Sequence, residues 1–211
     1  IFANEFFDCL ATKKFININK KWHEKKVNFN KKENRFFIQN ITLKSDYIVK
    51  KLNKIAIQHK LCENQVIEIS NPREKYFKKI CDFIKSNSGA AIIIDYGYLP
   101  PLNYSTLQSV KLHRKTNILD NPGNQDITSF VNFHDLLEIA KKNNLHIYGP
   151  VTQKEFLKKN GIEERKKKIL FKASQKHKRM IEKGYRRLIN HDQMGIIFKF
   201  LIVSTYKFSD E

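Results

Sequence analysis

The sequence lacks the glycine-rich loops that bind nucleotides and nucleoside cofactors. Its seven glycines are well separated and include no G-x-G pair, the feature that lets a backbone approach a pyrophosphate closely. A G-x-S-x-G turn is absent, and no pair of histidines has the spacing of metal ligands. The chain therefore carries no signature of a serine hydrolase or of a metalloenzyme, and we expect no metal.

Cysteines are few, and uninterrupted apolar runs are short. Cys9, Cys62 and Cys81 are far apart and form no C-x-x-C pair, which indicates reduced thiols. No apolar run approaches the roughly 18 residues of a membrane-spanning helix, and no secretory leader precedes the first strand. We expect a soluble protein of the bacterial cytoplasm with no membrane span. Because Ile1 lies inside a strand pattern, we also expect the chain to be part of a longer protein.

Acidic residues are scarce beside basic ones. The chain has 40 Lys and Arg against 21 Asp and Glu, a net charge of +19. Lys, Asn and Ile are abundant together, as AT-rich genomes tend to encode, so many lysines are explained as solvated surface residues. The exception is Arg165 to Arg187, where eleven basic residues accompany one acid, Glu182. This basic stretch is either a solvated helix face or a surface for an acidic partner or nucleic acid.

Strand and helix patterns alternate, which predicts an α/β fold. The run from Gly89 to Gly97 is continuously apolar before Asp95, as in a strand buried on both faces. Ile1 and Phe2 are interpreted as the end of a second buried strand. Residues 14–41 alternate as an antiparallel meander, with Trp22 filling its base.

Helices are expected where a cap precedes apolar residues at helical spacing. They are predicted after Ser45, from Asn71, over Ser105–Arg114 as a cover for the crevice, after Asn132, from Thr152 to Asn160, and as one long helix from Ile162 to Ile181. Further strands are predicted at residues 65–70, 145–149 and 195–204.

Seven motifs follow one another along the chain. They are Ala3–Asp8 (A-N-E-F-F-D), Glu68–Ser70, Gly89–Gly97, Thr106–Arg114, Asn121-Pro-Gly with Asp126–Phe133, Thr152–Leu157 with Gly161, Ile162 and Arg165, and Met194–Lys199. In this order they resemble the MidA family of S-adenosylmethionine-dependent methyltransferases, which includes a mitochondrial complex I assembly factor that methylates an arginine.

The resemblance implies the fold, the cofactor and the reaction. Residues 1–211 would form a single methyltransferase-like domain, the C-terminal part of a class I, Rossmann-like sheet with an inserted antiparallel meander and helices. The cofactor would be S-adenosylmethionine, and its glycine-rich loop would lie in an N-terminal half that this sequence lacks. The chain alone would then be inactive. Cys9 to Thr12 depart from the Ala-Leu-Pro that commonly follows A-N-E-F-F-D in the family.

The resemblance also implies a substrate, a protein with an exposed arginine such as a complex I subunit. A guanidinium stays protonated at neutral pH and is held by carboxylates through charge-assisted bonds. Glu5 and Asp8 are the predicted guanidinium ligands, and Asn4 is predicted to orient the cofactor end. Alternatively, Asp8 caps the next element and Glu5 pairs with a surface lysine.

Four further residues are predicted to bind substrate. Asp95 and Tyr96 follow the central strand and would line the pocket, unless they only terminate that strand. His113 and Arg114 would close over it, although a single histidine on a covering helix also suits a structural role. A different class of function stays open, a non-catalytic basic binding module from a truncated or split gene, and nucleic acid is the weaker alternative partner. The oligomeric state is not predicted.

Overall fold

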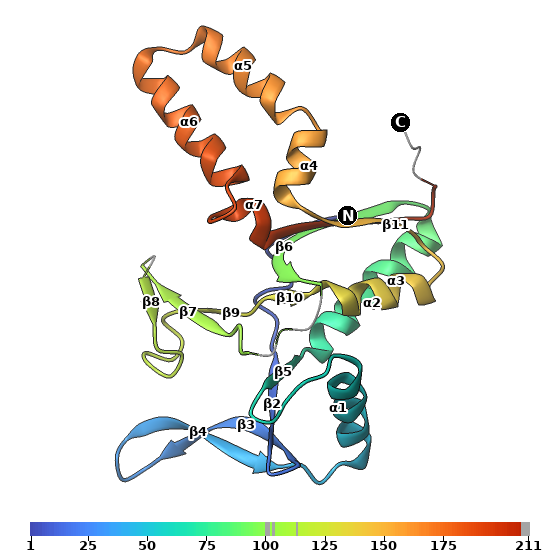
Figure 1. Cartoon of the computed structure of the whole chain (residues 1–211), viewed down its shortest axis with the longest axis vertical. Helices are drawn as coiled ribbons and strands as arrows, with labels where there is room; N and C mark the ends of the chain where they lie inside the picture. The colour runs from blue at the N-terminus through green and yellow to red at the C-terminus, as the bar shows by residue number, and fades with distance from the viewer. Residues whose placement is uncertain (100–101, 103, 113, 208–211) are drawn as a thin grey trace. The chain divides into compact units, whose positions relative to one another are not determined.

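The structure of the protein is a computed structural model (Figure 1). It describes residues 1–99, 102, 104–112 and 114–207. The chain divides into two compact units, each built from separate stretches. Unit 1 comprises residues 1–7, 77–99 and 131 onward, and unit 2 comprises residues 8–76 and 100–130. The chain passes repeatedly between the two units. The prediction that residues 1–211 form a single domain stays a prediction.

Unit 1 contains a mixed sheet in the order β1-β6-β12-β11, with β10 also paired to β6. Its strands are β1 (Phe2–Asn4), β6 (Ala90–Tyr98), β10 (Val131–Asn132), β11 (His146–Thr152) and β12 (Phe198–Ser204). β1 and β10 run parallel to β6, whereas β12 runs antiparallel to it. The α/β fold class is therefore confirmed.

Helices cover both faces of this sheet. The helices of unit 1 are α2 (Asn71–Asn87), which enters unit 1 at Phe77, α3 (Phe133–Lys142), α4 (Gln153–Lys159), α5 (Ile162–Lys172), α6 (Gln175–Ile189) and α7 (Met194–Ile197). α3 and the second half of α2 lie on one face, and α4 and α7 lie on the other (Figure 1). The caps predicted at Asn132 and Thr152 are confirmed, since Asn132 accepts from the His134 backbone and Thr152 forms a reciprocal capping box with Glu155. Ser45 precedes α1 as predicted, but its side chain accepts no capping hydrogen bond.

β6 is buried on both faces, as its continuous apolar run predicts. Ile93 and Ile94 are both buried although successive side chains of a strand point to opposite faces. On one face Ile94 packs in a cluster with Phe198 and Phe200. The ring of Phe156 from α4 stacks on that of Phe200 at 4.0 Å between centroids.

Unit 2 contains the predicted antiparallel meander. Its larger sheet has the order β4-β3-β2-β5, and a smaller one has the order β8-β7-β9. The elements are β2 (Lys13–Ile18), β3 (Lys21–Asn30), β4 (Arg35–Thr42), α1 (Asp46–Gln58), β5 (Val66–Ile69), β7 (Gln108–Lys111), β8 (Arg114–Thr116) and β9 (Asp126–Thr128).

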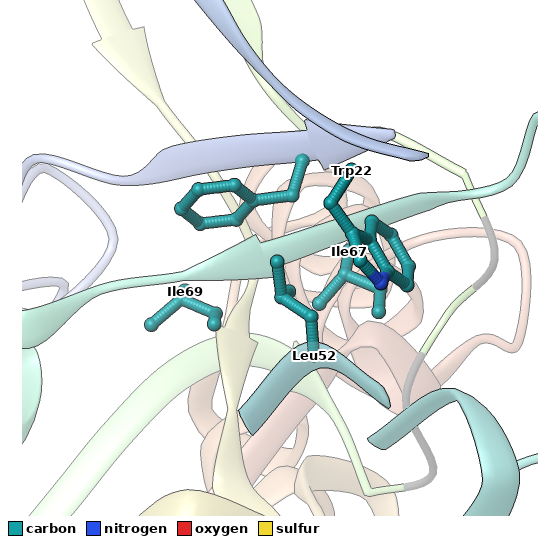
Figure 2. Packing of buried hydrophobic residues seen from close by; sticks show 5 residues of the cluster. Trp22, Leu52, Ile67 and Ile69 are labelled. Carbon is teal, nitrogen blue, oxygen red and sulfur yellow. The ribbon is translucent and has the colours of Figure 1, made fainter. Parts of the chain in front are cut away.

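The core of unit 2 lies between the larger sheet and α1. Phe15, Trp22, Leu52, Ile67 and Ile69 form one buried cluster, and Figure 2 shows Leu52 of α1 pointing towards Trp22 and Ile67. The indole Nε1 of Trp22 donates to the side chain of Asn53 at 2.8 Å. The packing role predicted for Trp22 is confirmed.

The predicted helix over Ser105–Arg114 is wrong. In the described part of this segment, β7 is followed by a turn with Leu112 at a φ of 50° and then by β8. β7 pairs with both β8 and β9, and the buried Ser109 hydroxyl lies 2.6 Å from that of Thr116. Ser and Val favour helices weakly, so pairing with strands distant in sequence decides the conformation.

The single long helix over Ile162–Ile181 is also wrong. The helix is interrupted at Ala173 and Ser174, whose backbones are both extended, so α5 and α6 are separate helices. Neither helix has a buried residue, which contradicts the predicted inner stripe. Sequence periodicity shows which residues share a face but not whether another element covers that face.

Two strand predictions need smaller corrections. The last strand begins at Phe198 rather than at Gly195, because residues 194–197 form the short helix α7. Ile1 and Phe2 were expected to be buried, but 50% and 67% of their surfaces are exposed. β1 is the end strand of the described sheet and pairs with β6 on one side only.

Gly97 gives a first testable prediction. A Cβ added there would lie 2.2 Å from the carbonyl oxygen of Val131, because β10 pairs directly with this position. We expect Gly97→Ala to lower the free energy of unfolding by about 1–3 kcal/mol, the usual cost of overpacking. Gly89→Ala is the matched control, since no atom lies within 4 Å of its added Cβ. Equal unfolding midpoints in urea for the two variants would contradict this packing.

Cys81 gives a second prediction. This thiol is fully buried in unit 1, whereas Cys9 and Cys62 are exposed. Burial raises the pKa of Cys81 from 9.0 to about 12, and a protonated thiol is a poor nucleophile. We expect a thiol reagent at about pH 8, near the ordinary thiol pKa, to label Cys9 and Cys62 in the folded protein and Cys81 only after unfolding.

The same shift predicts the direction of pH dependence. The folded state keeps the Cys81 proton where the unfolded state loses it, so this stabilisation is complete below pH 9.0 and is lost as pH rises towards about 12.

Cys81→Ala provides the control for the labelling experiment, because this substitution should leave labelling of the folded protein unchanged. Labelling of three thiols in the folded wild type would contradict the burial of Cys81.

Candidate active site

The two predicted strand ends lie side by side in unit 1. Asn4 pairs in register with Ile94, directly before Asp95. The backbone N–H of Glu5 donates to the carbonyl of Ile94 at 2.9 Å, and a left-handed φ of 47° at Glu5 turns the chain away from the strand. Asn4 and Glu5 are exposed, and their side chains meet at 3.4 Å. The carboxyl ends of parallel strands are where ligands bind in open α/β sheets.

Asp95 holds the turn that follows β1. It is completely buried, and one carboxylate oxygen accepts from the backbone N–H of Phe7 at 3.0 Å. The other oxygen accepts from the N–H of Tyr96, also at 3.0 Å. A buried carboxylate needs such donors because desolvation without them is costly. The geometry therefore gives Asp95 a positioning role for the segment that carries Glu5.

Tyr96 belongs to the opposite face of β6. Its ring packs edge-on against that of Phe198, its partner in the β12 register, with 5.3 Å between centroids. Tyr96 is also part of the apolar surroundings of the Ile94 cluster. Since consecutive strand residues point to opposite faces, the structure does not bring the side chains of Asp95 and Tyr96 together.

Asp8 lies in unit 2 and lines a pocket of about 260 Å³. Only 5% of its surface is exposed. The pocket combines polar groups with aliphatic walls, and its lining includes Cys9, Thr12, Val27, Leu107, Ile127 and Ser129. Of the predicted ligands that the structure describes, Asp8 is the one in this pocket. The arrangement suits a ligand with an apolar stem and a cationic end.

Arg73 fixes the backbone around Asp8. Its guanidinium is buried and donates to the carbonyl oxygens of Asp8 at 3.0 Å, Ser129 at 2.7 Å and Phe130 at 2.8 Å. The N–H of Ser129 in turn donates to the carbonyl of Asp8 at 3.0 Å. The planar guanidinium has five donors in a fixed arrangement, so it can hold several strands of backbone together.

Glu68 of β5 ties a second loop to the same unit. Its carboxylate accepts from the backbone N–H of Thr106 at 2.9 Å and from the hydroxyls of Ser105 and Thr106 at 2.9 and 2.5 Å. The Thr106 hydroxyl also accepts from the N–H of Phe130 at 2.9 Å. Burial lowers the pKa of Lys14, which lies opposite Glu68 in the β2–β5 register, and the charge of Glu68 opposes this shift.

The predicted covering residues are placed differently. His113 lies outside the described residues. Arg114 is exposed at the start of β8, across the hairpin from Lys111, so it belongs to a strand and not to a covering helix. Among the described residues no group of three His, Cys, Asp or Glu is arranged to hold a metal ion.

Sequence reasoning missed the roles of Arg73, Ser129 and Thr106. Glu68, Thr106 and Ser129 occur in the recognised motifs, so they could have been selected as linked residues. Arg73 follows the helix start at Asn71-Pro72 and has no local pattern that separates it from the other basic residues. Only the meeting of residues 8, 73 and 129 in space identifies it.

The chain is similar in sequence to known methyltransferases. Residues 1–151 match a family of S-adenosyl-L-methionine-dependent methyltransferases. The chain is 32% identical over 207 residues to the mitochondrial protein arginine methyltransferase NDUFAF7 of Xenopus tropicalis, covering 95% of this chain and 45% of that protein. For the Danio rerio protein of the same name the identity is 29%, with coverage of 95% and 46%. The chain thus spans less than half the length of these relatives.

Solved structures share the fold. Two crystal structures of Burkholderia thailandensis proteins, one of them bound to S-adenosyl-homocysteine, each superpose with a TM-score of 0.85 and 23% identity. They cover 96% of this chain, which corresponds to 54% and 52% of theirs. This likeness concerns the fold, whereas the sequence match covers most of the chain. The chain therefore belongs to this family of S-adenosyl-L-methionine-dependent methyltransferases, the MidA family that its motifs resemble.

Proposed function

We propose that the protein takes part in S-adenosylmethionine-dependent methylation of arginine side chains in a protein substrate. The observation that carries this proposal is the placement of Asp8 in a pocket with aliphatic walls. An arginine side chain has the matching chemistry, since its methylene stem packs on apolar surface while its charged end bonds to a carboxylate. The named relatives that are protein arginine methyltransferases support the same substrate class.

Glu5 and Asn4 have a separate role in this proposal. They are exposed at the carboxyl end of β1. The amide of Asn4 fits the polar methionine end of the cofactor, and the carboxylate of Glu5 fits a guanidinium beside it. The cofactor supplies the methyl group. Asp95 acts through the turn, because its bond to the Phe7 N–H fixes the segment that presents Glu5.

The remaining cofactor contacts would come from residues outside this sequence. The chain has no G-x-G loop, and it covers 45% of a relative that is named as a methyltransferase. We infer that residues 1–211 form the substrate-side part of the enzyme and are inactive alone. A complex I subunit is the substrate we favour. The predicted bacterial cytoplasm stays a prediction beside relatives named as mitochondrial, and no described helix is long and apolar enough to span a membrane.

The cofactor inference is tested by calorimetry. We expect residues 1–211 to show no saturable binding of S-adenosylmethionine at micromolar concentrations, and the longest protein that the gene encodes to bind it. The reason is the missing backbone loop for the nucleoside part of the cofactor. Saturable binding by residues 1–211 would place the cofactor site within this sequence.

The guanidinium ligands are tested in that longest form. Glu5→Gln and Asp8→Asn keep the side-chain shape but remove the charge that pairs with a protonated guanidinium. Losing a charge-assisted hydrogen bond costs about 1.5–3 kcal/mol, so we expect kcat/KM for methyl transfer to fall about 10- to 150-fold. Cofactor affinity should change little.

Glu33→Gln is the matched control, since Glu33 is an exposed carboxylate paired with Arg35 at the β3–β4 turn. Thermal unfolding of each variant separates loss of fold from loss of chemistry. Methylation by Glu5→Gln and Asp8→Asn that stays near the level of Glu33→Gln would remove both residues from the site and favour their capping and surface roles.

A further inference from the structure

The helical hairpin formed by α5 and α6 extends away from the sheet of unit 1 (Figure 1). Polar contacts near its base hold the two helices together. The Tyr185 hydroxyl donates to Glu163, and the ammonium of Lys166 lies 3.8 Å from the centre of the Tyr185 ring. Lys166 also pairs with Glu182 at 3.9 Å. The hairpin is therefore fastened at its base by groups other than its apolar residues.

The apolar residues of the hairpin are exposed nearer its tip. Phe171 is 88% exposed and Met180 is 63% exposed, and Ile169 is exposed as well. These three side chains line an open groove of about 1130 Å³, together with Ile181. A contiguous apolar surface of this kind marks a site of association, whereas single exposed apolar residues are ordinary.

Basic residues surround the apolar side chains. Lys167, Lys168 and Lys172 line the same groove, and His177 lies beside them. Along Arg165 to Arg187 the chain has eleven basic residues and one acid. The groove is thus lined by both apolar and basic side chains, and a ligand must match both.

We propose that this groove between α5 and α6 binds an acidic amphipathic helix of a partner protein. The apolar face of such a helix would cover Ile169, Phe171 and Met180, and its carboxylates would pair with the lysines, as in helix-in-groove recognition. Methionine suits this role because its flexible side chain adapts to different ligand shapes.

Other occupants fit the groove less well. A second copy of this chain carries a net charge of +19 and is repelled. Arginine-rich segments are repelled for the same reason. A bilayer surface is nearly flat and does not enter a concave groove, and a nucleic acid pairs with the lysines but leaves the apolar side chains uncovered.

The test uses the whole chain and a labelled peptide of about 20 residues, roughly 30 Å as a helix. The peptide alternates Leu at helical spacing with Glu, and a second peptide has Lys in place of each Glu. We expect saturable binding of the acidic peptide in fluorescence anisotropy and none of the basic peptide. Phe171→Ser combined with Met180→Ser should weaken binding of the acidic peptide by about 10-fold or more, as loss of an anchor residue does.

Charge reversal tests the lysines of the groove independently. Lys167→Glu with Lys168→Glu should weaken binding of the acidic peptide, whereas Lys31→Glu with Lys32→Glu changes the net charge equally at the β3–β4 turn and should have little specific effect. Tyr47→Ser is the control for the apolar anchors, since Tyr47 is exposed on α1. Circular dichroism checks that each variant keeps its helices.

The remaining outcomes overturn the proposal. Vesicles with about 30% phosphatidylserine, which mimic an anionic leaflet, and an unrelated DNA duplex are tested in parallel at about 150 mM salt, where exposed charges are screened beyond roughly 8 Å. Vesicle binding that needs Phe171, without peptide binding, would assign the surface to membranes. Sequence-independent DNA binding alone would assign it to nucleic acid, and binding of no probe would make it a solvated surface.

Discussion

Unit 1 depends on the burial of β6 between two layers of helices. This strand pairs with β1 and β10 in parallel and with β12 antiparallel, so its backbone is bonded along its length to segments from both ends of the chain. Its apolar side chains supply the driving force, because burying both faces of one strand removes a large area from water. Asp95 interrupts that apolar strand at the position where β1 ends. The strand therefore fixes both the core of the unit and the turn that presents Glu5.

In unit 2 a buried cation, Arg73, holds the backbone at Asp8 in place. Arg73 bonds to three backbone carbonyls from two stretches of chain that are far apart in the sequence. An isolated buried charge would be destabilising, but these dipoles replace the water that the guanidinium loses. Asp95 and Arg73 thus have the same role with opposite charges. Each is a buried charged group that is compensated by hydrogen bonds to backbone groups, and these bonds fix the backbone in position. Rigid backbone is what a site needs if it is to aim one nitrogen of a guanidinium at a methyl donor.

The lysines are distributed differently from the buried Asp95 and Arg73. Most lysines of the chain lie on exposed faces, where a surface ion pair contributes little to stability. At the α5–α6 hairpin, by contrast, basic side chains surround exposed apolar ones. This combination is the basis for the proposal that the basic stretch binds an acidic partner, where composition alone left a solvated face, an acidic partner and nucleic acid open.

The sequence by itself determined the α/β class, the buried β6 strand, the caps at Asn132 and Thr152, and the family. These features are local, because they depend on apolar periodicity, on side chains that bond to nearby backbone, and on short motifs in order. It failed where partners distant in sequence decide the outcome. For β7, strand pairing overrides a weak helical pattern, and α5 and α6 are two separate helices without a buried residue. Only the tertiary structure revealed that Arg73 meets Asp8 and Ser129, and that Asp95 and Tyr96 face apart. A contact between residues 56 to 65 positions apart leaves no local pattern in the sequence, because its energy comes from groups that the fold alone brings together.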